Sequence, residues 1–67
     1  MLVQLSHEDL TAMGRGATVR ARSAAGWTVV LHGGDVPEHA LHELRIRRRT
    51  VLRTSGEPLV LVAPWLA

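Results

Sequence analysis

Two stretches of alternating apolar and polar residues predict a β-hairpin in the first half of the chain. Residues 17–22 alternate alanine or valine with threonine or arginine. Residues 27–32 also place apolar residues at every second position. Alternation of period two is typical of strands that bury one face. Gly26, in the loop between them, suits a turn that requires positive φ. We expect an antiparallel hairpin with Arg20 and Arg22 on its more polar face.

A short strand and a short helix are predicted before this hairpin. Residues 1–5 resemble a strand, and Ser6 then offers a good helix N-cap. Asp9 stands three residues later, in the position that completes a capping box. Gly14 can adopt the left-handed conformation that ends many helices. We therefore place the first helix at about residues 7–13.

A second capping signature follows the hairpin. Asp35 is the expected cap of a second short helix, and Glu38 stands three residues after it. An apolar stripe that ends at Leu44 supplies one buried face. The β-branched residues from Ile46 onward favour a change to strand near Leu44, although the helix could also continue through the arginines.

Two more strands are predicted at the end of the chain. As a strand, residues 45–53 would place arginines along one face, and the turn at residues 55–58 would lead into an apolar strand at residues 59–62. The elements together predict a single α+β domain of 67 residues. We expect a mostly antiparallel sheet of about five short strands with two short helices.

The apolar C-terminal strand predicts self-association. A strand that is apolar on both faces needs cover on both, and two short helices can cover only one. The chain has no cysteine, so no disulfide bond can stabilise so small a core. We expect a homodimer or higher oligomer; the alternative is that the tail folds back over its own core. The expected interface residues are Leu59, Leu61, Val62, Trp65 and Leu66.

Charge gives the main functional signal. All eight basic residues are arginines, confined to residues 15–22 and 45–53, and the six acidic residues lie outside both segments. Arginines two residues apart on a strand are about 6.6 Å apart, which suits contact with successive phosphates. We expect binding to nucleic acid, DNA or RNA; the alternative is an acidic protein partner. The candidate binding residues are Arg45, Arg47, Arg49 and Arg53, flanked by Arg20 and Arg22.

Other chemistry is weakly represented. His39 and His42 stand three residues apart beside glutamates, a pattern too common on wet helix faces to predict a metal. The serines fall at predicted caps and turns, so we expect neither catalysis nor a cofactor. No apolar run reaches the ~18 residues of a membrane helix. We expect a cytoplasmic, non-enzymatic protein with a regulatory role and no membrane partner.

Two stretches resemble known families. Residues 1–3, 26–31 and 36–39 are similar to the carbon storage regulator family of small RNA-binding dimers. Residues 53–64 resemble the hairpin of antitoxins of the prevent-host-death class. Each resemblance covers less than half of the chain and the two imply different folds, so we assign the chain to neither family.

Overall fold

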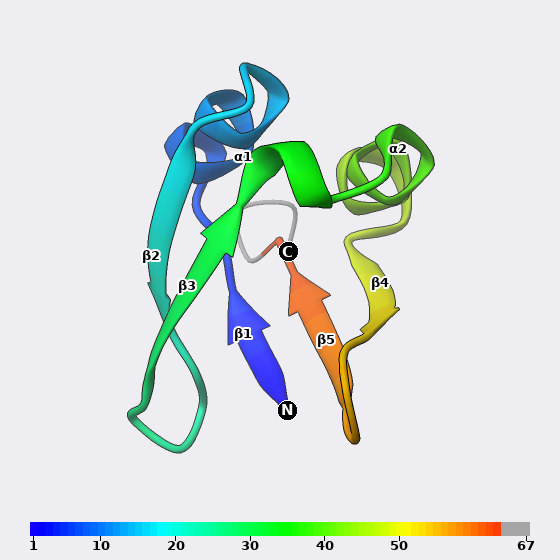
Figure 1. Cartoon of the computed structure of the whole chain (residues 1–67). Coiled ribbons are helices and arrows are strands. Elements are labelled where there is room, and N and C mark those ends of the chain that lie inside the picture. The colour runs from blue at the N-terminus through cyan, green and yellow to red at the C-terminus, as the bar shows by residue number, and fades with distance from the viewer. Residues whose placement is uncertain (64–67) are drawn as a thin grey trace.

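The computed structural model describes residues 1–63, and the elements in this part of the chain follow one another in the predicted order (Figure 1). They are β1 (Leu2–Gln4), α1 (His7–Gly14), β2 (Thr18–Arg22), β3 (Thr28–His32), the 3₁₀ helix η1 (Gly33–Asp35), α2 (Glu38–Arg47), β4 (Arg49–Arg53) and β5 (Pro58–Val62). The α+β fold class is therefore confirmed.

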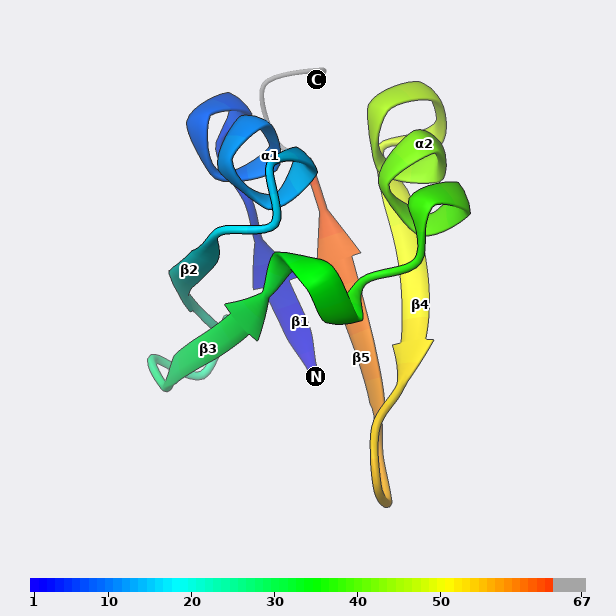
Figure 2. The ribbon, with the colours of Figure 1, turned by 45° about the horizontal axis from the view of Figure 1, so that its top comes forward.

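The strands form two sheets that meet at one bridge. β5 is the middle strand of a three-stranded sheet, parallel to β1 and antiparallel to β4. β2 and β3 form the expected antiparallel hairpin. Val3 bridges to Ser23, and the Ala24 N–H donates to the Leu2 carbonyl at 2.9 Å, which brings β1 beside the end of β2. The β2-β3 hairpin lies on the β1 side of the three-stranded sheet, and β4 lies on its other side, next to β5 (Figures 1 and 2).

The core lies between the inner faces of these strands and the two helices. Both helices lie at the end of the molecule toward which β1 and β5 point (Figure 2). Alternate residues of the strands meet one apolar stripe from each helix in a single cluster. Its largest fully buried side chains are Val3, Leu5, Leu10, Met13, Leu44 and Leu61.

Two local predictions are confirmed in detail. The Ser6 hydroxyl accepts from the Asp9 N–H at 3.1 Å, and the Asp9 carboxylate accepts from the Ser6 N–H at 3.1 Å, so the capping box is complete. Gly26 has φ of 86° in the hairpin loop. In the alternation of residues 27–32 Trp27 shares a face with Val29 and Leu31, but it is 70% exposed because it lies in the turn, before β3 begins.

The first helix ends differently from the prediction. Gly14 is its last helical residue, and the left-handed residue is Gly16, with φ of 79°. The Gly16 N–H donates to the Met13 carbonyl and the Ala17 N–H to the Ala12 carbonyl, both at 3.0 Å. This pair of bonds is the Schellman arrangement, which needs its left-handed residue two positions beyond Gly14.

The second helix differs at both ends. Asp35 is not its cap, because η1 takes up that residue; the N-cap is Pro37, which makes no side-chain cap bond. The helix also runs past Leu44 to Arg47 and ends at Arg48, whose φ is 65°. The change to strand near Leu44 was therefore wrong. Good helix formers and the pair between Glu43 and Arg47 outweigh the single β-branched Ile46.

The position of β5 changes the expected interface. Leu59 is 4% exposed and Leu61 is fully buried, because both face the core of their own protomer. They are therefore not available to a second subunit, which corrects that prediction. Val62 is half-buried on the opposite face of the sheet. Trp65 and Leu66 lie outside the described residues.

Candidate functional site

The arginines of residues 45–53 do not form the predicted ladder on one strand face. Arg45 and Arg47 belong to α2, where side chains turn by about 100° per residue, and only Arg49 and Arg53 belong to β4. Arg48 lies at the junction in the left-handed conformation. The strand prediction for Arg45 and Arg47 is therefore wrong, for the same reason that the helix is longer than expected.

Arg45 reaches toward the other helix. Its Nη2 atom lies 3.1 Å from the position that a Cβ on Gly14 would occupy. The guanidinium therefore lies against the C-terminal turn of α1, which has no basic residue of its own. A positive charge near a helix C-terminus is stabilising. Arg45 therefore lies apart from the remaining arginines of this segment, and its part in binding stays a prediction.

The other four arginines form a surface that we call the basic edge. Arg47, Arg48 and Arg49 follow one another at the junction of α2 and β4, and Arg53 ends β4. All four are exposed. Within residues 1–63 the one arginine ion pair joins Arg47 Nε to Glu43 Oε2 at 3.2 Å, and the Arg47 side chain there is 75% exposed. Such a pair is worth only about 0.3–0.5 kcal/mol, so the basic edge is available to other anions.

Arg20 and Arg22 lie apart from the basic edge. They occupy the exposed face of β2, opposite Val30 and Thr28 of β3. They belong to the two-stranded sheet, whereas Arg49 and Arg53 belong to the three-stranded sheet. The expectation that Arg20 and Arg22 flank the binding surface stays a prediction.

Acidic residues are segregated from the strands. The five strands of residues 1–63 carry four arginines and no aspartate or glutamate. The acidic residues lie on helices or on the turn between β4 and β5: Glu8, Asp9, Asp35, Glu38, Glu43 and Glu57. The charge pattern in space therefore follows the pattern in sequence: the arginines on the strands have no acidic neighbour on the same strand.

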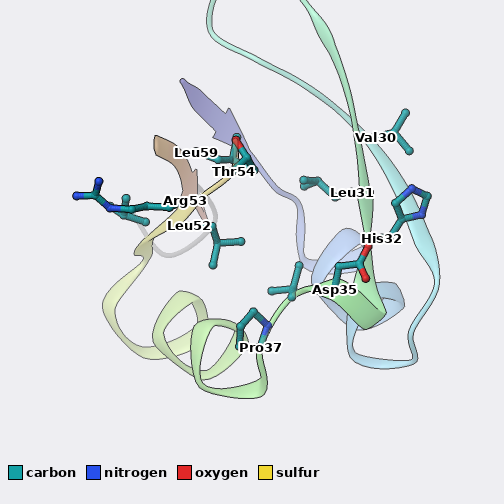
Figure 3. Close-up of a pocket in the computed structure, with 11 residues that line it drawn as sticks. Val30, Leu31, His32, Asp35, Pro37, Leu52, Arg53, Thr54 and Leu59 are labelled. Atoms are coloured by element: carbon teal, nitrogen blue, oxygen red, sulfur yellow. The ribbon is translucent and has the colours of Figure 1, made fainter. Parts of the chain in front are cut away.

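A cleft that the sequence did not indicate lies between β3 and β4. Its volume is about 410 Å³. Leu31 and Leu52 point into it from opposite sides, and Leu59 of β5 also lines it, whereas the Arg53 side chain points away (Figure 3). Residues 35–37 close one end. No local pattern could reveal this cleft, because it depends on how two distant strands are placed in space.

The described residues offer little beyond these two surfaces. His32 Nδ1 lies 3.1 Å from the Thr18 hydroxyl across the hairpin. Among residues 1–63 no three histidine, aspartate or glutamate side chains gather closely enough to hold a metal ion, and His39 and His42 are both exposed. None of the helices in this part of the chain is long and apolar enough to span a bilayer. The arrangement is thus suited to binding through guanidinium groups and through an apolar cleft.

Comparison with protein-family models, with curated proteins and with solved structures gives no match for this chain.

Proposed function

We propose that this protein is a non-enzymatic regulatory module that binds nucleic acid through the basic edge. The observation that supports the proposal is the position of four exposed arginines on β4 and at its junction with α2, with no acidic residue on β4 or β5. Guanidinium groups bind phosphate through two parallel hydrogen bonds, which favours them at such surfaces. The cytoplasm is the compartment that we propose for this activity.

Binding of this kind would rest on the phosphate backbone more than on the bases. Neither helix carries an arginine-rich recognition face, and the chain has no Phe or Tyr on which bases could stack. Four phosphate contacts predict a slope of about −3 in log affinity against log salt, since each contributes roughly −0.7 to −0.9. Between about 50 and 200 mM salt, affinity should therefore fall about 50- to 150-fold.

The test is fluorescence anisotropy of labelled single- and double-stranded oligonucleotides at about 50 and 200 mM salt. Arg49→Ala should weaken binding uniformly across sequences and flatten the salt slope by about one unit. Arg20→Ala is the matched control, because it removes an exposed strand arginine outside the basic edge. Absence of binding at the lower salt, or equal effects of the two variants, would refute the proposal. If no oligonucleotide binds at the lower salt, an acidic protein partner becomes the better explanation of the arginines.

Self-association is proposed as well, through the outer face of the three-stranded sheet. Leu2 and Val51 are 39% and 53% exposed there, and Val60 and Val62 are half-buried beside them. An apolar sheet face of this kind is a common interface between subunits. Light scattering across a concentration series tests this: the mass should rise toward a multiple of the protomer, and a constant protomer mass would contradict it.

A further inference from the structure

The backbone of β4 has one edge without a partner strand among the described residues. The Ala63 N–H donates to the Arg48 carbonyl at 3.0 Å, so these two residues are a hydrogen-bonded pair of the ladder between β4 and β5. Because such pairs alternate with non-bonded pairs, the even-numbered residues of β4 bond to β5 and the odd-numbered residues direct their backbone groups outward. The outward residues are Arg49, Val51 and Arg53.

We propose that this edge and the adjoining cleft bind an extended acidic segment of a partner protein by strand addition. Three residues with outward N–H and C=O groups supply up to six backbone hydrogen bonds to an added strand. An added strand would also lie along the opening of the cleft, which Val51, Leu52 and Arg53 line. The inference goes beyond nucleic-acid binding, because it uses the backbone edge and the cleft, and phosphate contact needs neither.

Charge decides which side chains the segment should carry on its outer face. Arg49, Val51 and Arg53 are all exposed on one face of β4. In an antiparallel pair, directly opposite side chains have their Cβ atoms about 4.5–5.5 Å apart and interact. The added strand should therefore place acidic residues opposite Arg49 and Arg53, and an apolar residue opposite Val51.

The cleft decides the side chains on the inner face. The residues opposite Thr50 and Leu52 would point toward the cleft, which the apolar side chains of Leu31 and Leu59 line. Apolar side chains at these two positions would gain burial there. The resulting five-residue pattern is acidic, apolar, apolar, apolar, acidic.

The same charges disfavour a second copy of this chain as the added strand. If two β4 strands pair antiparallel about Val51, the register that overlaps them fully, then Arg49 of each copy lies opposite Arg53 of the other. Like charges directly opposite one another are destabilising. The edge is therefore better matched to an acidic segment from another protein than to itself.

A synthetic peptide tests the inference directly. The probe is a fluorescein-labelled peptide of sequence Ser-Glu-Leu-Val-Leu-Glu-Ser, titrated with the full chain and followed by anisotropy. We expect saturable binding, and loss of binding when lysine replaces both glutamates. Equal binding of the lysine peptide, or no binding of the glutamate peptide, would overturn the inference. If the glutamate peptide does not bind but oligonucleotides do, the inference is wrong and the proposed function is retained.

Val51→Pro separates the backbone edge from the arginines. The Val51 N–H faces outward, so proline removes a bond to the added strand without removing one to β5, and prolines are tolerated on edge strands for this reason. Peptide affinity should fall about tenfold or more, whereas oligonucleotide affinity should stay within about twofold, because all the arginines remain. Unchanged peptide affinity would overturn the inference.

A change in the peptide alone covers the case in which Val51→Pro fails to fold. N-methylation of the central valine removes the N–H that faces β4 and should abolish binding, because that residue pairs with Val51. N-methylation of a neighbouring leucine, whose N–H faces away from β4, is the matched control and should retain binding. Equal effects of the two methylated peptides would contradict strand addition.

Discussion

A methyl group on Gly33 should collide with the backbone at the end of α1. A Cβ there would lie 2.5 Å from the Met13 carbonyl oxygen, 2.8 Å from the Met13 Cα and 2.8 Å from the Ala17 carbonyl oxygen. Gly33 also donates its N–H to the Ala17 carbonyl at 3.0 Å, so it cannot move away without weakening that bond. The next residue, Gly34, has open space at the same position. Neither glycine has a positive φ.

The expected cost of Gly33→Ala follows from these contacts. Overpacking costs about 1–3 kcal/mol, and loss of a backbone hydrogen bond about 0.5–1.5 kcal/mol more. We expect destabilisation of about 2–4 kcal/mol, a large part of the roughly 3–10 kcal/mol that a chain of this size has in total. Gly34→Ala should instead stabilise by about 0.4–1 kcal/mol, because alanine reduces the conformational freedom of the unfolded chain.

Urea unfolding followed by far-ultraviolet circular dichroism measures both variants. The two midpoints should move in opposite directions from that of the unmodified chain. A Gly33→Ala protein within about 0.5 kcal/mol of the unmodified chain would refute the reasoning, because a surface substitution without a clash has that size of effect. Equal stability of the two variants would refute it as well.

Three further substitutions test the local structure. Ser6→Ala removes the capping hydroxyl of α1 and should cost about 1 kcal/mol in thermal unfolding; unchanged stability would contradict the capping box. Leu44→Ala truncates a fully buried side chain and should cost about 2–5 kcal/mol in urea, so a loss below about 1 kcal/mol would place Leu44 outside the core. Arg48→Gly places glycine at a left-handed position and should stabilise the fold by about 1 kcal/mol. The same substitution removes one phosphate contact and should flatten the salt slope of oligonucleotide binding. A less stable protein would contradict the assigned backbone conformation.

The sequence predicted those parts of the fold that local chemistry determines. The capping box at Ser6 and Asp9 needs only residues within one turn, and both hydrogen bonds form as expected. The β2-β3 hairpin rests on alternation and on Gly26, and both are local signals. The order of elements and the fold class followed from such signals.

Helix ends near the candidate site were harder to predict, because local signals compete there. Gly14 and Gly16 are both suited to ending α1, and the choice of Gly16 depends on which pair of carbonyls the following residues satisfy. The helix through Arg47 rests on good helix formers and on the pair between Glu43 and Arg47, whereas the alternation along residues 45–53 favoured a strand. The expected ladder of arginines failed for this reason.

The cleft and the free edge of β4 depend on the global arrangement of the strands. Within residues 1–63 β4 pairs with β5 alone, and the cleft is lined by residues of β3, β4 and β5. Nothing within β3 or β4 alone specifies how these strands lie relative to one another. Sequence patterns could therefore identify the arginines as candidates, but not which of them share a surface or what lies beside them.

An amide NMR titration of the isotope-labelled chain with a short single-stranded oligonucleotide, at about 50 mM salt, tests the central claim most directly. Phosphate binding at the basic edge predicts shift changes concentrated at residues 47–49 and at Arg53, with the β2-β3 hairpin unaffected. Changes centred on Arg20 and Arg22, or no changes at all, would contradict the assignment of the basic edge as the binding surface.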